Sequence, residues 1–592
     1  MSLKVPKSSN LQLFKSGYKH LSGLEDAVLR NIEAVAELTD LVKTSFGPNG
    51  RNKLIINHMQ RLFITSNAAT ILQEIEVVHP AAKLLVMASQ AQETEMGDAS
   101  TLTLIFAGEL LKLAEPLLIM GLHPSEVIQG FELACAKALA ELETLSTSSL
   151  PIPLTSATLQ NAIKPVIAAK QLGSEDVLAS LVAEAALSVL PFKKTSKGSE
   201  YVAKDFNVDN VRVVKILGGS LLSSRVVRGM VFPREPEGTI KKATKAKVAV
   251  FTCGLDIAQT ETKGTVLLKN AEEMLNFTKG EEKQMEKIVK EIADSGVKVI
   301  IAGSSVGDLA MHYLNRMSIC VVKVLSKFDL RRLCRVVGAT PLARMGPPTP
   351  EEAGYVDVLE CIEIGGDRVV VLRQLSDEER SGTKDTGERT RTSTIVLRGA
   401  TQNSLDDLER AVDDGINVMK ALLKDGRLVP GAGATELELA RRVESYGASL
   451  KGLNQHAVRK FATALEVVPR TLAENAYGGS EASEIVGKIW AKHNSQEKDS
   501  ATWGVDVEVG PPFSPKKNRQ TNILNLQIES GGDGTLQATK AGIVDSLAAK
   551  SWALKSATEA AVTVLSVDSI IMSKPAGGPK IPQQAGNWDE DD

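Results

Sequence analysis

Four glycine-rich segments contain the residue types best suited to holding phosphate groups. Backbone N–H groups bind phosphate oxygens, and small residues allow the ligand to approach those groups closely. Taken singly, each segment is also explained as a plain turn between two helices. The segments are SFGPNGRNK at 45–53, GDAST at 97–101, PGAGATE at 430–436 and GGDGT at 531–535.

GDAST is the most informative of the four, because Asp98 directly precedes the predicted helix ASTLTLIFAGELLKLAEPLL. An aspartate that caps the helix N-terminus accounts for it in purely structural terms. In the functional alternative, the N–H groups of Ala99, Ser100 and Thr101 hold phosphate oxygens while the Asp98 carboxylate binds Mg²⁺. The residues alone leave both explanations open.

Two further carboxylates, Asp407 and Asp414, share the polar face of a predicted helix. A solvated helix face explains such residues without any function. Metal-assisted hydrolysis, however, needs a carboxylate that orients water for in-line attack. Because the sequence does not show that Asp98 and Asp414 converge, these residues indicate no more than a candidate nucleotide site.

Several common kinds of site are disfavoured by the motifs. No G-x-x-x-x-G-K-[ST] phosphate loop occurs in the glycine-rich segments, and GAGATE lacks the third glycine of a dinucleotide fingerprint. No Asp or Glu occurs in 446–465, where such a fold places its ribose-binding acid. The cysteines form no C-x-x-C pair, so we expect free thiols and neither a zinc site nor a disulfide framework: Cys135, Cys253, Cys320, Cys334 and Cys361.

Length and composition indicate a large soluble protein. The 592 residues exceed what one hydrophobic core usually organises, so about three domains are expected. A net charge of -3 gives no field that would attract nucleic acid. No apolar run is long enough to cross a membrane, and the start MSLKVPKSSN lacks the apolar core of a signal peptide. We therefore expect a cytoplasmic protein with neither nucleic acid nor membrane as partner.

Helical patterns occupy both ends of the chain. Ser22 and Glu25 form an S-x-x-E capping box before an apolar helical stripe, and the pattern continues to about residue 145. A second block begins at 404, where Ser404 is the expected cap. Its apolar stripe is Leu405, Leu408, Val412, Ile416 and Met419.

Between these blocks, short β-branched runs alternate with helical segments such as GDLAMHYLNRM. This alternation predicts an α/β layer inserted into a helical domain. The polar stretches at 195–207 and 376–393 read as loops, and the Gly-, Pro- and acid-rich tail reads as disordered. The predicted strands are 211–217, 247–253, 297–303, 318–324 and 367–372.

The motifs taken together resemble the group II chaperonins across almost the whole chain. Several of them in a fixed order are far more specific than any one alone. HPAAK and RLVPGAGATE are similar to one subunit type of the eukaryotic cytosolic chaperonin ring. The motifs are FGPNGRNK, ITSNAATIL at 64–72, HPAAKLLVMAS at 79–89, GDAST, RLVPGAGATELELA at 427–440 and WGVDV at 503–507.

This resemblance implies a chaperonin fold, a multidomain α+β and α/β architecture with three domains and a disordered tail at 576–592. A helical equatorial ATPase domain comes from both chain ends, and a small intermediate domain acts as a hinge. An inserted α/β apical domain binds substrate and carries a helical protrusion near 257–280. The implied ranges are 1–150 with 411–575, 151–217 with 373–410, and 218–372, in that order.

The resemblance also implies ATP or ADP with Mg²⁺ as cofactors, in a site whose parts are matched motif by motif. Asp98 matches the metal ligand, Asp414 the aspartate that activates water, and Lys170 a lysine that senses the phosphates. Asp98 and Asp414 are thus the expected catalytic pair. The other residues implied to bind nucleotide are Ser45, Gly47, Pro48, Ala99, Ser100, Thr101, Gly431, Ala432, Asp506, Val507, Asp545 and Lys550.

In the apical region, the helix KFDLRRLCRVV at 327–337 matches the substrate-facing helix of the family. Its mixed surface would offer both polar and apolar contacts to unfolded polypeptides, although a helix with three arginines is more often simply solvated. The residues implied to contact clients are Lys327, Phe328, Arg331, Arg332 and Arg335.

Departures from the family pattern fall on the candidate site. The usual GDGTT reads GDAST, so Ala99 adds a methyl group where glycine permits the closest phosphate approach. Asn57 and Asn67 each replace an acid, and an amide neither accepts a proton nor adds negative charge. We therefore predict ATP binding with slow hydrolysis.

The function implied is that of an ATP-dependent chaperone subunit. Such a subunit would assemble with paralogous chaperonin subunits into a double ring that encloses unfolded polypeptides, cytoskeletal proteins among them. The alternative is an architectural subunit of the same ring that holds nucleotide with little hydrolysis. A conventional enzyme built on the inserted α/β layer is disfavoured, because no phosphate loop follows a predicted strand.

Overall fold

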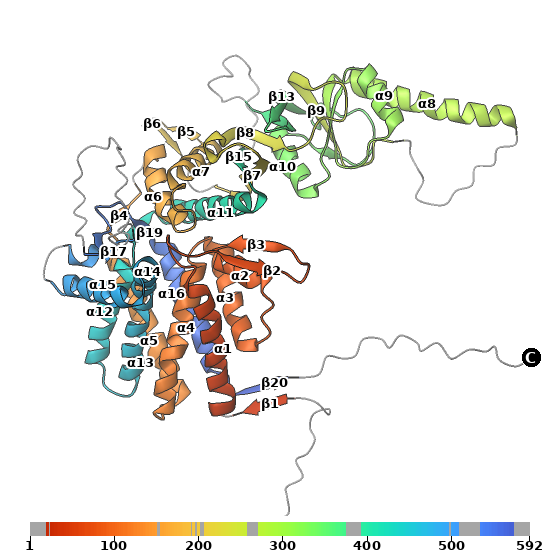
Figure 1. Ribbon diagram of the computed structural model, residues 1–592. Coiled ribbons are helices and arrows are strands. Elements are labelled where there is room, and N and C mark those ends of the chain that lie inside the picture. Colours follow the sequence, from red (N-terminus) through yellow and green to blue (C-terminus); the bar gives the residue numbers. More distant parts are fainter. Residues whose placement is uncertain are drawn as a thin grey trace, which may run out of the picture.

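The computed structural model shows three parts in succession (Figure 1). A helical bundle made from both chain ends forms the base, a layer of three helices lies beside it, and a part built on the large sheet lies beyond that layer. The residues described are 19–22, 24–150, 154–190, 192–195, 198–201, 206–256, 270–374, 392–495, 499–507 and 533–572.

The bundle has one core shared by the two ends of the chain. The rings of Phe106 and Phe461 meet edge to face with centroids 5.3 Å apart, and Phe131 lies 6.1 Å from Phe461. Phe106 and Phe131 precede the sheet in sequence while Phe461 follows it, so burial of these rings joins distant segments. The helices are α1 (Arg30–Lys43), α2 (Ala68–Glu74), α3 (Pro80–Met96), α4 (Ser100–Ile119), α5 (Pro124–Thr144), α12 (Ala434–Ser449), α13 (Asn454–Leu465), α14 (Val467–Tyr477), α15 (Gly479–His493) and α16 (Leu547–Leu565).

The middle layer consists of α6 (Ser156–Ala168), α7 (Glu175–Val189) and α11 (Gln402–Lys424). The predicted apolar stripe of α11, from Leu405 to Met419, is buried as expected and packs with α6 and α7 into one core. Helix α11 runs without a break through residues 410 and 411, where the sequence suggested a domain boundary.

The large sheet has the strand order β11-β10-β9-β13-β14-β8-β15-β7, and β12 pairs with β9. Strands β9, β10 and β11 are parallel, whereas β13, β14 and β8 pair antiparallel with their neighbours in the sheet. The strands are β7 (Val211–Leu217), β8 (Arg225–Phe232), β9 (Lys242–Phe251), β10 (Val297–Ala302), β11 (Cys320–Lys323), β12 (Pro341–Leu342), β13 (Gly354–Ile364), β14 (Asp367–Arg373) and β15 (Ser393–Gly399).

All five strand predictions are confirmed, because each β-branched run coincides with β7, β9, β10, β11 or β14. Helix α9 (Asp308–Arg316) also falls where the helical segment was predicted, and α10 (Lys327–Val337) matches the predicted range. Helix α8 (Ala271–Asp294) extends away from the sheet (Figure 1). Most of the predicted protrusion, 257–269, lies outside the described residues, as does the tail.

Small two- and three-stranded sheets complete the fold. One prediction is corrected among them: β5 (Phe192–Thr195) and β6 (Gly198–Tyr201) form an antiparallel hairpin that extends into the stretch at 195–207, which read as a loop. The second polar stretch lies outside the described residues except for its last two positions. The other small sheets pair β1 (Lys19–Ser22) with β20 (Ser569–Met572), β2 (Lys53–Ile56) with β3 (Leu62–Thr65), β17 (Trp503–Val505) with β18 (Thr535–Gln537), and β16 (Arg427–Pro430) with both β4 (Ser148–Ser149) and β19 (Val544–Ser546).

The first helical block begins where the pattern predicts it, because a π-helix, Leu24–Leu29, leads directly into α1, although Ser22 itself ends strand β1. The cap predicted for the second block, Ser404, is wrong. Helix α11 is capped by Thr401, whose hydroxyl accepts the N–H of Ser404. The hydroxyl residues Thr401 and Ser404 are three positions apart, and sequence alone does not show which of them caps α11.

In the described part of the chain, no helix is both long and apolar enough to cross a membrane.

Candidate nucleotide site

Asp98, Lys170 and Asp414 converge although they are far apart in sequence. Asp98 lies between α3 and α4, Lys170 follows α6, and Asp414 is on α11. The Lys170 ammonium lies 3.5 Å from the Asp414 carboxylate. The positive charge of Lys170 acts to lower the pKa values of both the Asp98 and the Asp414 carboxyl groups. Two acids and one lysine therefore face one another across three elements.

The residues on either side of Asp98 both have a left-handed backbone conformation. Gly97 ends α3 with φ 73°, and Ala99 starts α4 with φ 63°. This backbone region suits glycine and costs other residues about 1–2 kcal/mol. Ala99 stands where the GDGTT motif has its second glycine. The replacement therefore adds backbone strain as well as the bulk of a methyl group.

Asp98 is not the helix cap. Its carboxylate accepts the N–H of Ala99 at 2.6 Å, whereas the N-cap residue is Ala99 itself, which has no side-chain cap. The first N–H groups of α4 consequently have no capping side chain from this turn, and they carry the positive end of the helix dipole. Of the two explanations left open for Asp98, simple N-capping is therefore wrong.

Asp414 is buried, with 5% of its surface exposed. Burial raises the pKa of its carboxyl group to about 7; Lys170 acts against this, while the charges of Asp98 and Glu93 add to it. A carboxyl group that titrates near neutral pH is suited to accepting a proton from water. Asp407, one of the pair considered from sequence, instead pairs with Arg410 on its own helix at 2.8 Å.

A second cluster lies at the start of α16. Lys550 is 7% exposed, and its ammonium lies 2.6 Å from Glu436 and 2.9 Å from Asp545. Burial lowers the pKa of Lys550, but the two carboxylates outweigh it and raise that pKa. The second oxygen of Glu436 is buried without a hydrogen-bond partner. Two carboxylates therefore neutralise the Lys550 ammonium, and one Glu436 oxygen remains without a hydrogen-bond partner.

Gly431 keeps the Asp545 carboxylate accessible. A Cβ at residue 431 would lie 3.3 Å from an Asp545 oxygen and 2.9 Å from the Ile543 side chain. Any larger residue would therefore crowd the acid expected to contact ribose. The next residue, Ala432, adopts φ 55°, and its carbonyl accepts the N–H of Val505 at 2.9 Å.

The residues expected on the base side follow β17 directly. Asp506 is buried, and its carbonyl accepts the Tyr477 hydroxyl at 2.6 Å. The carbonyl of Val507 accepts the Asn49 amide at 3.0 Å. This contact joins the base-side segment to the loop at 45–50, so two of the motifs implied by the resemblance are adjacent in space.

That loop is packed closely against α14. A Cβ at Gly47, which has φ 80°, would lie 2.5 Å from the Leu472 side chain. Pro48 and Asn49 follow it at the tip of the loop. The Ser45 hydroxyl is buried without a partner. Such an unpartnered donor at the expected phosphate-side loop fits a phosphate ligand.

Each asparagine that replaces an acid lies against a glutamate. The Asn67 amide donates to Glu93 at 3.0 Å, and the Asn57 amide donates to Glu74. Glu93 also raises the pKa of Asp414, which places its charge beside the candidate catalytic group. Sequence reasoning missed both glutamates, although Glu93 lies on the helix turn that precedes GDAST.

The five residues of helix α10 that were predicted to bind clients differ in their exposure and in their partners. Lys327, Arg331 and Arg335 are exposed, and Phe328 is 74% exposed. Arg332 instead pairs with Asp209 at 3.4 Å and with Asp329 at 3.5 Å. Four of the five therefore lie free on one face of the helix, while Arg332 is engaged within the protein.

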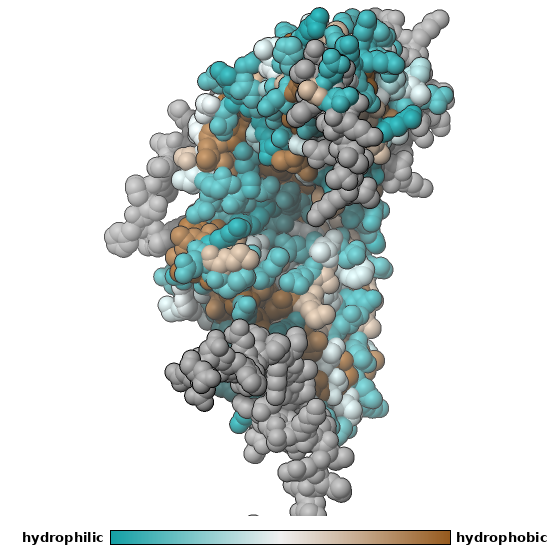
Figure 2. All heavy atoms as spheres, turned by 90° about the vertical axis from the view of Figure 1, so that its right-hand side faces the viewer, coloured by the Kyte–Doolittle hydropathy of each residue, from teal (hydrophilic) through white to brown (hydrophobic). Residues whose placement is uncertain are grey.

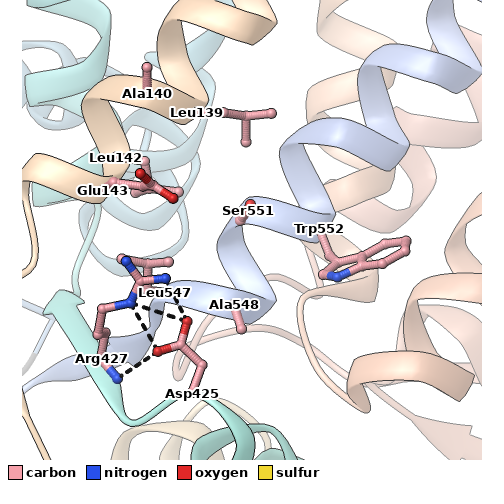
Figure 3. A pocket seen from close by; sticks show the side chains of 10 residues that line it. All are labelled: Leu139, Ala140, Leu142, Glu143, Asp425, Arg427, Leu547, Ala548, Ser551 and Trp552. Atoms are coloured by element: carbon pink, nitrogen blue, oxygen red, sulfur yellow. Dashed lines mark hydrogen bonds and ion pairs between the residues drawn. The ribbon is translucent and has the colours of Figure 1, made fainter.

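A separate cavity of about 460 Å³ lies beside the site (Figure 3). It shares α16 with the candidate site but uses other side chains of that helix, and the Trp552 ring points away from the other lining side chains. None of its lining residues belongs to the predicted nucleotide set. They are Leu139, Ala140, Leu142, Glu143, Asp425, Arg427, Leu547, Ala548, Ser551 and Trp552.

Comparison with known proteins decides the family. The model of the TCP-1/cpn60 chaperonin family matches residues 38–575. The chain belongs to the TCP-1/cpn60 chaperonin family. The match spans the helical bundle, the middle layer and the sheet, so this chaperonin has the multidomain chaperonin fold that the motifs implied, and it is a chaperone.

The curated relatives of the chain include theta subunits, the type that HPAAK and RLVPGAGATE indicate. The chain is 52% identical to the "Probable T-complex protein 1 subunit theta" of Schizosaccharomyces pombe, 50% identical to the "T-complex protein 1 subunit theta" of Saccharomyces cerevisiae and 47% identical to that of Homo sapiens. Each comparison covers the full length of both chains.

Proposed function

We propose that this chaperonin binds ATP with Mg²⁺ and hydrolyses it slowly to drive a folding cycle. The observation that carries the proposal is the convergence of Asp98, Lys170 and Asp414, with 3.5 Å between the lysine and Asp414. Asp98 is suited to binding a metal ion, Asp414 to activating water, and Lys170 to contacting phosphate oxygens.

The surrounding residues fit a nucleotide. The first turn of α4 offers uncapped N–H groups, Ser45 offers an unpartnered hydroxyl, and Gly431 leaves room beside Asp545. Mg²⁺ is usually held by one or two carboxylates together with phosphate oxygens, so Asp98 alone can supply the protein's share. When bound, Mg²⁺ would neutralise charge that develops on the phosphates.

In this arrangement Asp414 orients water and accepts its proton, while Lys170 holds the Asp414 carboxylate in place. Glu93 lies close enough to contribute negative charge, and Asn67 fixes its position. Neither asparagine can itself take a proton, and Ala99 is strained at the phosphate side. We infer that hydrolysis is slower than in a site with glycine and acids at these positions.

A second candidate is a subunit that holds nucleotide with little hydrolysis and serves the architecture of the ring. The salt bridge between Lys550 and two acids favours it, because this lysine charge is already neutralised within the protein. Single-site turnover separates the two candidates: the first predicts slow release of phosphate, and the second predicts none above background.

We also propose that the chain works within a hetero-oligomeric double ring of paralogous chaperonin subunits in the cytoplasm. The hairpin β2–β3 supports such an assembly. Leu54 pairs with Ile64, and Ile56 with Leu62, so that four apolar side chains share one face. This face is exposed, with Leu54 at 64% and Ile56 at 66%, and the hairpin projects from the bundle (Figure 1).

A solvent-exposed apolar face of this kind marks a protein contact. Figure 2 views the molecule from the side toward which β2 and β3 project, and apolar surface is visible around the middle of that view. The family relationship makes a neighbouring subunit the occupant that fits best.

Unfolded polypeptides such as cytoskeletal proteins are the proposed clients. The exposed face of α10 supports this role, because Phe328 offers an apolar contact beside three cationic side chains. Such a mixture suits segments that are apolar and acidic.

Equilibrium titration with a fluorescent ADP analogue tests the nucleotide proposal. We expect Asp98→Asn to lose the Mg²⁺-dependent part of the affinity, because an amide does not replace a carboxylate as a magnesium ligand. Asp407→Asn is the matched control, since Asp407 pairs with Arg410 on the same helix as Asp414 but outside the cluster. Absence of binding by the wild-type chain would disprove the proposal.

A further inference from the structure

Gln92, near the end of α3, is a buried side chain that contacts the turn carrying Asp98. Only 2% of its surface is exposed. Its side-chain nitrogen donates to the Asp98 carbonyl at 3.1 Å and to the Ala549 carbonyl on α16 at 3.2 Å. Both partners are carbonyl oxygens, which only accept, so the two N–H bonds of the amide are both used. Gln92 therefore ties the Asp98 turn to α16.

The other end of the same amide is not satisfied. The Oε1 atom of Gln92 is buried and has no hydrogen-bond partner among the described residues. A buried acceptor without a partner costs free energy on folding, so this side chain is a poor source of net stability. Its presence is better explained by the geometry that its two N–H groups impose on the turn.

The contact with Gln92 fixes the orientation of the Asp98–Ala99 peptide. In a trans peptide the C=O and N–H groups point in opposite directions. Because the Asp98 carbonyl points at Gln92, the Ala99 N–H points away from it, and this N–H donates to an oxygen of the Asp98 carboxylate at 2.6 Å. The carboxylate is thereby held on the side of the turn opposite to Gln92.

The opposite orientation of this peptide would relieve strain at Ala99. A half-turn of the peptide plane would change the φ of Ala99 from 63° to about −117°, which L-residues adopt more readily than the left-handed region. The next peptide would stay in place, because the Ala99 carbonyl accepts the N–H and the hydroxyl of Thr103, each at 3.0 Å. The same half-turn would move the Ala99 N–H away from the Asp98 carboxylate. With alanine at residue 99, backbone strain thus opposes the orientation that Gln92 holds.

We propose that Gln92 is a positioning residue for Asp98, which holds the Asp98–Ala99 peptide against the strain at Ala99 and so keeps the carboxylate ready to bind Mg²⁺. The inference rests on the proposed nucleotide binding. In the observed orientation the charges of Lys170 and Asp545 shift the pKa of Asp98 in opposite directions, so the carboxylate is within electrostatic reach of both parts of the site. Without Gln92 the turn would populate the rotated peptide, and Mg²⁺ would lose a preformed ligand.

Equilibrium binding of ADP to the full-length chain, with Mg²⁺ and with EDTA, tests this role. Gln92→Met keeps the length of the side chain but has no N–H donor, and we expect it to lower the affinity for ADP with Mg²⁺ at least about fivefold. In EDTA the affinity should change less than about twofold, because no metal then needs the carboxylate. Gln90→Met is the matched control, since Gln90 lies two residues earlier on the same helix, and it should retain both affinities.

Ala99→Gly should rescue the loss. Glycine adopts φ 63° without strain, so the rotated peptide gains little from it. In the Ala99→Gly background, Gln92→Met should therefore lower the affinity for ADP with Mg²⁺ less than about twofold. An equal loss in both backgrounds would overturn the inference, and so would a loss that is the same with Mg²⁺ and with EDTA, because either result would indicate a purely structural role.

Gln92→Asn is the second variant, because it keeps an amide that is one methylene group too short to reach both carbonyl groups. It should show the same dependence on Mg²⁺ and the same rescue, and it decides the question if Gln92→Met does not fold. Unchanged affinity with Mg²⁺ in a folded variant, or failure of both variants to fold, would overturn the inference. A wild-type chain that binds no ADP in either condition would instead contradict the proposed function.

Discussion

The Lys170 ammonium lies 3.5 Å from the Asp414 carboxylate, and this ion pair joins the end of α6 to the middle of α11. Both groups are largely buried, so the pair is a poor source of net stability but a strong constraint on geometry. Breaking it leaves an uncompensated charge beside Asp98. The ion pair therefore links the arrangement of the middle layer to the chemistry at the bundle surface.

The first prediction concerns Lys170→Met. Without the ammonium, the pKa of Asp414 should rise further above 7, because Lys170 is the group that opposes its burial. We expect ATP turnover at neutral pH to fall by about tenfold or more, since a protonated carboxyl group cannot accept a proton from water. Lys164→Met on α6, the helix that Lys170 follows, is the control, because Lys164 pairs at the surface with Asp176. Equal turnover in both variants would contradict the role given to Lys170.

The second prediction concerns pH. Since the native pKa of Asp414 is about 7, above the ordinary 3.8, the native state holds this proton more tightly than the unfolded chain does. The ionised carboxylate therefore costs stability, and this cost appears as pH rises from about 4 and is complete above about 7. Turnover should rise over the upper part of the same range.

Asp414→Asn removes that cost. Relative to the wild type, its melting temperature should be higher at pH 8 than at pH 5, although it lacks turnover. Melting curves of both chains at the two pH values provide the test. A difference that is the same at both pH values would show that Asp414 is ionised throughout.

The third prediction concerns Ala99→Gly. Glycine relieves the cost of φ 63° and clears the methyl group from the start of α4. We expect ADP affinity to rise a few-fold, while stability changes by no more than about 1 kcal/mol because glycine also loosens the unfolded chain. Ser318→Gly is the matched control: Ser318 has φ 58° but lies beside β11 in the sheet. An equal gain of affinity in both variants would rule out a local effect at the phosphate side.

The fourth prediction concerns the exposed face of the β2–β3 hairpin. Leu54→Thr combined with Ile64→Thr retains residues suited to a strand but removes a cross-strand apolar pair. We expect this double variant to melt like the wild type but to enter ring particles poorly, as measured by size-exclusion chromatography of reconstituted complexes. Leu222→Thr, at a position that is 80% exposed elsewhere, should assemble normally. Normal assembly of the double variant would remove this face from the ring contact.

Much of the architecture could be predicted from sequence because it depends on local patterns. Runs of β-branched residues gave five strands at their correct places, and the stripe from Leu405 to Met419 gave the buried face of α11. The cap of α11 was less predictable, because Thr401 and Ser404 both carry a hydroxyl group and only the folded chain shows that Thr401 is the cap. The domain boundaries remain predictions, and the one at 410 falls within a continuous helix.

The candidate site could be predicted only in part. Asp98 and Asp414 stood out as residues, but their approach depends on how α11 packs against the bundle, which no local pattern records. The strain at Ala99 and the neutralised charge of Lys550 are also tertiary properties. Glu93 was within reach, since it precedes GDAST on the same helix.

The most direct test of the central claim is single-site turnover by a reconstituted ring in which only this subunit retains a functional site. We predict slow phosphate release with the wild-type chain, and none with Asp414→Ala despite retention of bound nucleotide. Phosphate release that is unchanged by Asp414→Ala would contradict the account.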